Sequence, residues 1–157
     1  MKVALAEARK AYALGEVPVG AVITRNSEII AAAHNLVEST DDPAAHAEII
    51  ALKRASERLG RRQLNDCILY VTLEPCAMCT GAILLYRIGA LAFGAFDAVA
   101  GCCMSNAELL SVLNYRIPFV GGILENECRM ILSEFFQNMR KKRTENCNGI
   151  EYCLTEA

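Results

Sequence analysis

The stretch from Cys67 to Cys79, with the sequence CILYVTLEPCAMC, combines two kinds of secondary structure. Its first half, Cys67 to Thr72, is a continuous apolar run, which is typical of a strand covered on both faces. Pro75 then favours the opening of a helix, which we expect to continue to about Tyr86. Another apolar run, Leu91 to Ala95, follows and predicts a further strand. This alternation of strand and helix is typical of an α/β fold.

The segment before this stretch predicts a helix, a hairpin and a second helix. We expect a short amphipathic helix around Leu5 to Tyr12 that ends at Gly15, and a hairpin of two strands within residues 17–33. Asp42-Pro43 has the pattern of a helix start, and Gly60 that of the matching end.

The segment after it predicts a loop over 97–106, a short helix over 107–113 and a brief strand near Phe119. A last helix has an apolar stripe from Cys128 to Met139, an acidic first turn and a basic end that suits the helix dipole. The whole order predicts one domain over 1–143, a three-layer α/β/α sandwich around a mixed central sheet. We expect a loose tail over 144–157.

Two short motifs offer side chains that bind zinc and move protons. Cys76 and Cys79 stand three residues apart at the start of a predicted helix, so their thiolates share one face. The positive end of the helix dipole favours the thiolate form. His46 supplies a third ligand from a different helix. Three protein ligands leave a tetrahedral zinc one position for water, which is typical of a catalytic site.

Glu48 is a carboxylate beside this ligand set, and it makes hydrolytic deamination the predicted reaction. Zinc lowers the pKa of its bound water toward about 7. Glu48 takes that proton as the hydroxide attacks the amidine carbon of a base, and then delivers protons to the ring nitrogen and to the departing ammonia. We therefore expect one Zn2+ per subunit and Glu48 as the catalytic residue. Because side chains two residues apart diverge on an ideal helix, His46 and Glu48 require an irregular first turn or a carboxylate that reaches around the helix end.

A lone C-x-x-C pair also occurs in structural zinc sites and in redox proteins. A structural site needs four protein ligands, but the chain has only two histidines, and a four-cysteine site would have to recruit Cys102 or Cys103. That arrangement would leave His46 and Glu48 without a role. Redox chemistry of the thioredoxin kind lacks its surrounding pattern. The sequence favours the open catalytic site.

Composition limits the class of protein. The 157 residues are 54% hydrophobic and 22% charged, as in one compact domain, and the net charge of −2 requires any nucleic-acid contact to be local. Glu7 lies where a signal peptide would be apolar, and no segment reaches the length of a membrane span. We therefore expect a cytoplasmic protein with no membrane partner and with reduced thiols. The cysteines expected in the core are Cys67, Cys102, Cys103 and Cys128.

Three stretches resemble the bacterial tRNA adenosine deaminases, the TadA family. They are Gly15–Val22 (GEVPVGAV), Asp42–Ile49 (DPAAHAEI) and Leu69–Cys79 (LYVTLEPCAMC), and the similarity continues to about Arg143. The zinc motif is common to the cytidine deaminase superfamily, whereas GEVPVG and the later Phe-Phe pair are more particular. The resemblance implies a homodimer of the cytidine deaminase-like fold. It also implies hydrolysis of the wobble adenosine in a tRNA anticodon stem-loop to inosine.

The resemblance further implies roles in substrate binding. It suggests that Asn35, which is otherwise an ordinary turn residue, bonds the target base and that the backbone of Val19 and Gly20 lines the base pocket. It places Asp97 against the anticodon strand and Asn114 near the RNA loop.

The contacts with RNA outside the base pocket have more than one interpretation. The cations from Arg140 to Arg143 either meet phosphates or only complement a helix end. Phe96 and Val99 stand where the family often has basic residues, and Tyr115 replaces a common histidine. Phe96 offers either a stacking face for an unpaired base, worth about 1–3 kcal/mol, or a buried subunit contact.

Two other functions stay open at this point. A deaminase of a free guanine- or cytosine-type base or nucleoside would share the motif and fold, but it would need a closed pocket. A non-catalytic partner subunit would be expected to lack the proton-shuttling carboxylate, which is present here as Glu48. The size of the substrate distinguishes a free-base deaminase from a tRNA deaminase. Turnover by the purified chain alone would exclude a non-catalytic partner subunit.

Overall fold

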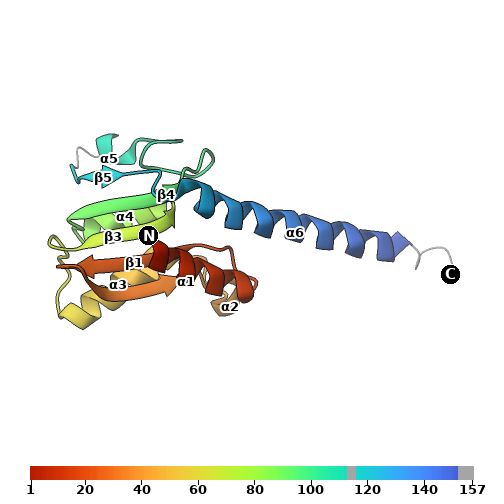
Figure 1. Ribbon diagram of the computed structural model, residues 1–157, viewed down its shortest axis with the longest axis horizontal. Coiled ribbons are helices and arrows are strands. Elements are labelled where there is room, and N and C mark those ends of the chain that lie inside the picture. The colour runs from red at the N-terminus through yellow and green to blue at the C-terminus, as the bar shows by residue number, and fades with distance from the viewer. Residues whose placement is uncertain (113–115, 152–157) are drawn as a thin grey trace.

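A five-stranded mixed sheet forms the centre of the computed structural model, which describes residues 1–112 and 116–151 (Figure 1). β1 (Gly20–Arg25) and β2 (Glu28–His34) form an antiparallel hairpin, and β3 (Ile68–Leu73) pairs antiparallel with β1. β4 (Ala90–Ala95) runs parallel to β3, and β5 (Phe119–Val120) runs parallel to β4. The strand order is β2-β1-β3-β4-β5, and the predicted mixed sheet is confirmed.

Helices cover both faces of this sheet, so the predicted three-layer sandwich is also confirmed (Figure 1). α1 (Lys2–Ala13) and α6 (Glu125–Glu151) contact each other and pack on one face. α3 (Ala47–Leu59) packs on the other face, with α4 (Ala77–Leu85) beside it. Two short helices complete the described chain, α2 (Val37–Thr40) and α5 (Leu109–Val112).

The core lies between these layers. Ile23, Leu69 and Phe93 of the sheet are fully buried, together with Leu52 of α3 and Ile83 of α4. The four cysteines predicted to pack in the core are buried, namely Cys67, Cys102, Cys103 and Cys128.

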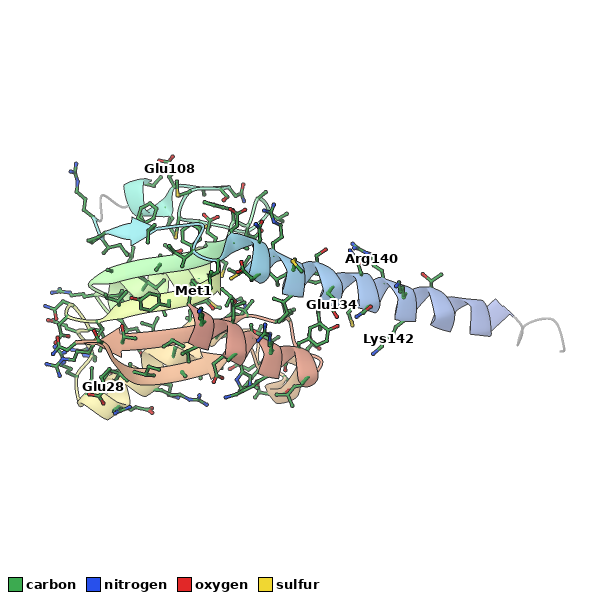
Figure 2. All side chains as sticks on the ribbon, viewed as in Figure 1. Met1, Glu28, Glu108, Glu134, Arg140 and Lys142 are labelled. Atoms are coloured by element: carbon green, nitrogen blue, oxygen red, sulfur yellow. The ribbon has the colours of Figure 1, made fainter. Side chains whose placement is uncertain are left out.

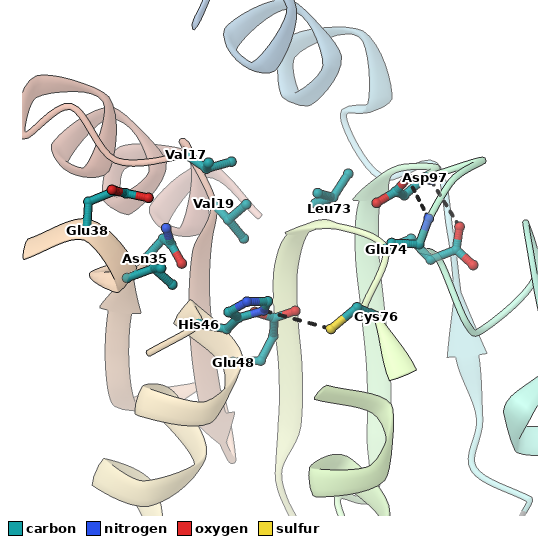
Figure 3. Close-up of a pocket in the computed structure, with 12 residues that line it drawn as sticks. Val17, Val19, Asn35, Glu38, His46, Glu48, Leu73, Glu74, Cys76 and Asp97 are labelled. Atoms are coloured by element: carbon teal, nitrogen blue, oxygen red, sulfur yellow. Dashed lines mark hydrogen bonds between the residues drawn. The ribbon is translucent and has the colours of Figure 1, made fainter. Parts of the chain in front are cut away.

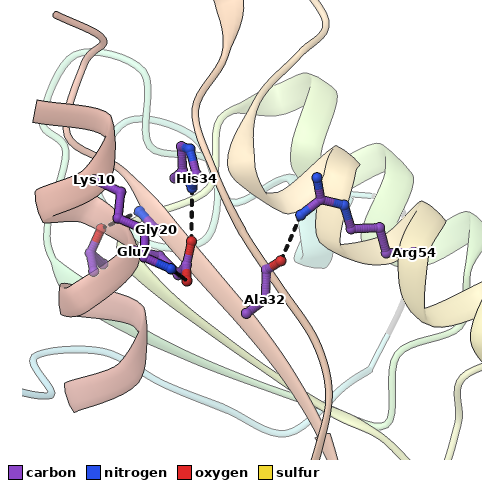
Figure 4. A network of polar contacts seen from close by, with 7 residues as sticks. Glu7, Lys10, Gly20, Ala32, His34 and Arg54 are labelled. Carbon is purple, nitrogen blue, oxygen red and sulfur yellow. Dashed lines mark hydrogen bonds and ion pairs between the residues drawn. The ribbon is translucent and has the colours of Figure 1, made fainter. Parts of the chain in front are cut away.

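The hairpin begins at Gly20 because α1 crosses the sheet there. A Cβ at Gly20 would lie 2.0 Å from the Ala4 carbonyl oxygen, a separation that no side chain tolerates. Glu7 of α1 accepts hydrogen bonds from Lys10 at 2.6 Å and from His34 at 2.8 Å, which ties α1 to β2 (Figure 4). On the other face, Arg54 of α3 donates to the Ala32 carbonyl oxygen at 2.8 Å (Figure 4).

The predicted start of α3 at Asp42 is wrong. The helix begins at Ala47, with His46 as its N-cap residue in an extended conformation. Asp42 instead closes a local turn, in which its Oδ1 accepts a hydrogen bond from the Ala44 N–H at 2.8 Å. The predicted end is confirmed, because Gly60 adopts a left-handed conformation at φ 64°.

α6 is longer than its sequence pattern indicates. Its predicted apolar stripe is partly buried against the domain, through Cys128, Leu132 and Phe135. The backbone stays helical to Glu151 and projects beyond the sheet, so the chain from Thr144 onward begins as helix and not as an irregular tail (Figure 1). Within the described residues, no helix combines the length and the apolar character that crossing a membrane requires.

Candidate active site

The three predicted metal ligands meet where two helices begin. His46 is the N-cap residue of α3, Cys76 is the N-cap residue of α4, and Cys79 lies in the first turn of α4. His46 Nδ1 lies 3.8 Å from Cys76 Sγ (Figure 3). It lies 3.5 Å from Cys79 Sγ. Two ligands of a tetrahedral zinc, with bonds of about 2.1–2.3 Å, stand about 3.6 Å apart. The spacing and the donor types therefore fit a zinc ion.

The N-cap position of His46 also explains how Glu48 reaches the same site. His46 has φ −70° and ψ 149°, which is extended and not helical. Because the chain turns between His46 and the first helical residue, side chains two residues apart are not forced onto diverging faces. Both residues line one cavity. Of the two alternatives that the sequence left open, the structure has the non-helical conformation at the helix start.

The two thiols carry unequal charge in the absence of a cation. Hydrogen bonds from Cys79 and His46 lower the pKa of Cys76 to about 4, so that Cys76 is a thiolate. The Cys79 pKa is raised, because its thiol donates to Cys76 and because it is buried. Two adjacent, desolvated thiolates repel each other unless a cation lies between them. The pair therefore has the chemistry of a site that a divalent metal completes.

Glu48 is almost fully buried, with 4% of its surface exposed. Burial raises the pKa of its carboxyl group, and this effect outweighs the attraction of the nearby His46 ring. A raised pKa brings a carboxyl group closer to the working pH and improves it as an acid and base. The burial of Glu48 and its raised pKa therefore suit the predicted role of moving protons beside the ligand set.

These residues open into a cavity of about 260 Å3 beside the start of β1 and the end of β3. Figure 3 shows Asn35 and His46 on one side, and Leu73, Cys76 and Asp97 on the other. The cavity combines apolar walls with a few polar groups, as ligand pockets do. It is lined by Val17, Val19, Asn35, Val37, Glu38, His46, Glu48, Leu73, Glu74, Cys76, Asp97 and Ala100.

A buried carboxylate that the sequence did not single out holds Asn35. Glu16 has no exposed surface, and it accepts hydrogen bonds from Asn35 Nδ2 at 3.1 Å, Glu38 N at 3.1 Å and Ser39 N at 2.6 Å. Because a carboxylate only accepts, the amide nitrogen of Asn35 must face Glu16. Its position in GEVPVG, an acid in an apolar segment, was the available signal.

Glu74 has a similar position on the opposite wall. It is 2% exposed, and its two oxygens accept hydrogen bonds from the loop that follows β4. The sequence interpretation did not include it, although an acid at the end of an apolar strand was visible. The loop that it contacts contains Asp97, a predicted substrate contact.

The other predicted substrate contacts fall into three groups. Val19 and Asp97 line the cavity. Gly20 does not line it, because its α-carbon lies against α1 and its N–H donates to Thr72 Oγ1 at 3.1 Å. Asn114 lies outside the residues that the structure describes.

A second hollow adjoins the mouth of the cavity and shares Val17 and Glu38 with it. Its remaining lining includes Phe136, which is 45% exposed, and Arg140 of α6. Arg140 and Lys142 project from α6 well before its end at Glu151 (Figure 2). Their charges therefore do not complement the C-terminal end of the helix dipole.

Phe96 lies in the loop after β4, next to Asp97, which lines the cavity. Its ring packs edge to face on Phe93, with 5.2 Å between centroids, and 43% of the residue is exposed. Val99 in the same loop is 83% exposed. Part of Phe96 is therefore exposed and available for a base or for another subunit.

Known proteins resemble the chain in both sequence and fold. The profile of the family described as the cytidine and deoxycytidylate deaminase zinc-binding region matches residues 1–95. The tRNA-specific adenosine deaminase of Bacillus subtilis (strain 168) is 48% identical over 145 residues, which cover 91% of this chain and 90% of that protein.

Two solved structures share this fold. One comes from a study of A-to-I editing by tRNA:A34 deaminases at the wobble position of transfer RNA. It matches with a TM-score of 0.81 and 40% identity, over 84% of this chain and 97% of that one. Guanine deaminase from Nitrosomonas europaea matches with a TM-score of 0.75 and 25% identity, over 85% of this chain and 81% of that one. The cytidine deaminase-like fold is confirmed, and the chain belongs to the zinc-binding cytidine and deoxycytidylate deaminase family and, within it, to the tRNA-specific adenosine deaminases.

Proposed function

We propose that this protein hydrolyses the wobble adenosine of a tRNA anticodon to inosine, with release of ammonia, and that one zinc ion per subunit serves the reaction. The observation that carries the proposal is the buried Glu48 carboxylate, which faces the same cavity as Asn35 and the His46 and Cys76 ligands. Relatives named tRNA-specific adenosine deaminases support the choice of substrate.

The metal would be held by His46, Cys76 and Cys79, and when bound it would supply an activated water. Glu48 takes a proton from the attacking water and returns protons to the ring nitrogen and the leaving amine. Asn35, fixed by Glu16, orients the base through the amide oxygen and the N–H that Glu16 leaves free. The apolar side chains of Val17, Val19 and Leu73 exclude bulk water from the base.

The surroundings of the cavity favour a polynucleotide over a free base. A free base would need a closed pocket, whereas here the adjoining hollow extends the mouth toward Phe136 and Arg140. An exposed aromatic ring and a cation are the groups that stack on bases and contact phosphates. An anticodon stem-loop would use both while its adenosine enters the cavity.

We also propose a homodimer that works in the cytoplasm, where its proposed tRNA substrate is found. Large apolar side chains on α4 and α5 are exposed, including Leu85 at 82% and Val112 at 78%. Large exposed apolar side chains on two helices that contact each other favour a subunit contact. Sedimentation of the purified protein tests this, and a monomer at micromolar concentration would contradict it.

The deciding experiment combines a metal assay with mass analysis of RNA. Purified protein of measured zinc content is incubated with an anticodon stem-loop that carries adenosine at the wobble position. We expect a gain of about 1 Da at that nucleotide, as NH is replaced by O, and a stoichiometric release of ammonia. No conversion by zinc-loaded protein would contradict the proposal.

The second candidate is a deaminase of free guanine-type bases, which the likeness to the guanine deaminase from Nitrosomonas europaea favours. The same preparation is given guanine, cytosine and their nucleosides, and ammonia is measured. Ammonia from a free base, without inosine in the stem-loop, would replace the first proposal by the second. A chain inactive on both sets of substrates would point to a partner subunit.

A further inference from the structure

We infer that Glu74 is a positioning residue for substrate binding, which holds the loop Asp97–Ser105 as one wall of the cavity. The inference rests on the proposed function and deepens it. Glu74 does not need to touch the reacting atoms, because its carboxylate is occupied by the loop. The loop itself faces the cavity through Asp97 and Ala100.

All five hydrogen-bond donors that contact the Glu74 carboxylate belong to the loop Asp97–Ser105. Oε1 accepts hydrogen bonds from the N–H groups of Cys103, Met104 and Ser105 at 3.1, 2.7 and 3.0 Å. Oε2 accepts from Asp97 N–H at 3.1 Å and from the Ser105 hydroxyl (Figure 3 shows the Asp97 contact). Both ends of the loop therefore converge on one buried carboxylate.

The backbone of the loop packs closely against the Glu74 carboxylate. A Cβ at Gly101 would lie 2.5 Å from the Asp97 carbonyl oxygen and 2.5 Å from a Glu74 carboxylate oxygen. The backbone of Gly101 also donates to that Asp97 carbonyl at 2.9 Å. Since only glycine fits, the loop folds tightly around the carboxylate.

Hydrogen bonds within the loop and to Glu74 fix the position of Asp97. Asp97 Oδ1 already accepts from the N–H groups of Val99 and Ala100, at 2.9 and 3.1 Å. With its backbone N–H bound to Glu74, the orientation of Asp97 toward the cavity is fixed from both sides. The Cys102 N–H donates to the Pro75 carbonyl oxygen at 2.9 Å, so the loop is also fixed against the residue that precedes Cys76.

The carboxylate is the side chain that this role requires. Five donors point at it, and a carboxylate accepts on both oxygens, whereas a glutamine amide accepts on one and presents donors on the other. Glu74→Gln keeps the size of the side chain, but it places an NH2 group against N–H donors of the loop and so makes part of the contact repulsive. Buried donors left without acceptors are costly, so the loop is expected to move away.

The test is steady-state deamination of an anticodon stem-loop by zinc-loaded wild type, Glu74→Gln and a matched control, Glu57→Gln. Glu57 is an exposed residue of α3 outside the cavity. For Glu74→Gln we expect KM to rise about tenfold, the effect of one lost charged hydrogen bond, with kcat within about twofold. Zinc content is expected to stay at the wild-type level.

Amide hydrogen exchange supplies a readout that does not depend on substrate. The amides of Asp97, Cys103, Met104 and Ser105 are expected to exchange faster in Glu74→Gln while those of β3 stay protected. A double-mutant cycle then asks whether Glu74 acts through the loop. In an Asp97→Ala background, adding Glu74→Gln should leave KM nearly unchanged.

The outcomes separate this inference from the proposed function. Wild type that makes no inosine contradicts the function, whatever the exchange data show. Active wild type with an unchanged KM in folded Glu74→Gln overturns the inference, as does loss of zinc or of kcat alone. Should Glu74→Gln not fold, Ser105→Ala removes one of the five donors. It is then expected to raise KM about threefold, and an unchanged KM would overturn the inference.

Discussion

The metal-binding end of the cavity and its outer rim are built in different ways. At the metal-binding end, His46 and Cys76 are N-cap residues, and Glu48 is 4% exposed, so helix ends and packing fix the reactive atoms. At the rim, Phe96 is 43% exposed and Val99 is 83% exposed. The proposed chemistry therefore depends on groups that the fold buries, whereas the proposed recognition of RNA depends on side chains that stay exposed to a partner.

The strongest test of the metal-binding end is Glu48→Ala. Removing the proton shuttle is expected to lower kcat about 10²–10⁴-fold, because general acid–base catalysis contributes about that much. Zinc is expected to stay near one per subunit, because the three ligands are unchanged. Metal analysis and single-turnover deamination measure the two effects.

Cys79→Ala serves as the contrasting variant, because it removes a ligand that is fully buried. This variant is expected to lose both zinc and activity. If Glu48→Ala also lost its zinc, or kept its activity, the separation between ligand and proton shuttle would be wrong.

The sequence predicted which residues gather at the metal-binding end, because the chemistry of this ligand set leaves few alternatives. Two thiolates, an imidazole, a spare carboxylate and their spacing specify one kind of site, and His46, Glu48, Cys76 and Cys79 do meet. The sequence could not show that His46 precedes the helix, because the turn closed by Asp42 competes with an earlier helix start. That detail is what brings His46 and Glu48 together.

Residues that act through buried hydrogen bonds were missed. Glu74 stands only two residues before Cys76, and Glu16 lies in GEVPVG, but nothing in their spacing specifies which N–H groups they accept from. Their partners come from segments that only the folded chain brings close. Gly20 is not among the residues that line the cavity, and the sequence could not show this because it does not reveal that α1 occupies the space beside Gly20.

The dependence of stability on pH tests how strongly Glu16 holds the cavity wall that contains Asn35. Burial acts to raise the pKa of Glu16, but hydrogen bonds from Ser39, Glu38 and Asn35 outweigh it and lower the pKa below its ordinary value. Such a group stabilises the fold above its unfolded pKa of about 4.3, and this contribution is lost as the pH falls through the folded pKa.

Glu16→Gln should therefore lower the free energy of unfolding by about 2 kcal/mol at pH 7, with a smaller difference below about pH 4. Urea unfolding at a series of pH values measures this. A difference that does not change with pH would mean that the ionised form of Glu16 makes no special contribution. Glu57→Gln, at an exposed position, is the control.

Phe96→Ala tests the rim and decides between the two roles of that ring. If a base of the anticodon loop stacks on its exposed face, stem-loop affinity should fall by about 1–3 kcal/mol while the sedimentation of the protein stays the same. If the ring lies in a subunit contact, the oligomer should dissociate first. Fluorescence anisotropy and sedimentation velocity on the same sample distinguish these results.

Reversing the charge of Arg140 is expected to have the smallest effect and gives the finest test of the rim. Arg140 lines the hollow beside the cavity, and α6 continues to Glu151, so its charge has no helix end to complement. Arg140→Glu should weaken stem-loop binding several-fold at low salt and reduce the slope of log K against log salt by about 0.7–0.9, the contribution of one phosphate contact. Lys53→Glu on α3, an exposed position outside both hollows, is the matched control and should leave that slope unchanged. Equal slopes for the two variants would mean that RNA does not follow α6 and that the rim ends at the Phe96 loop.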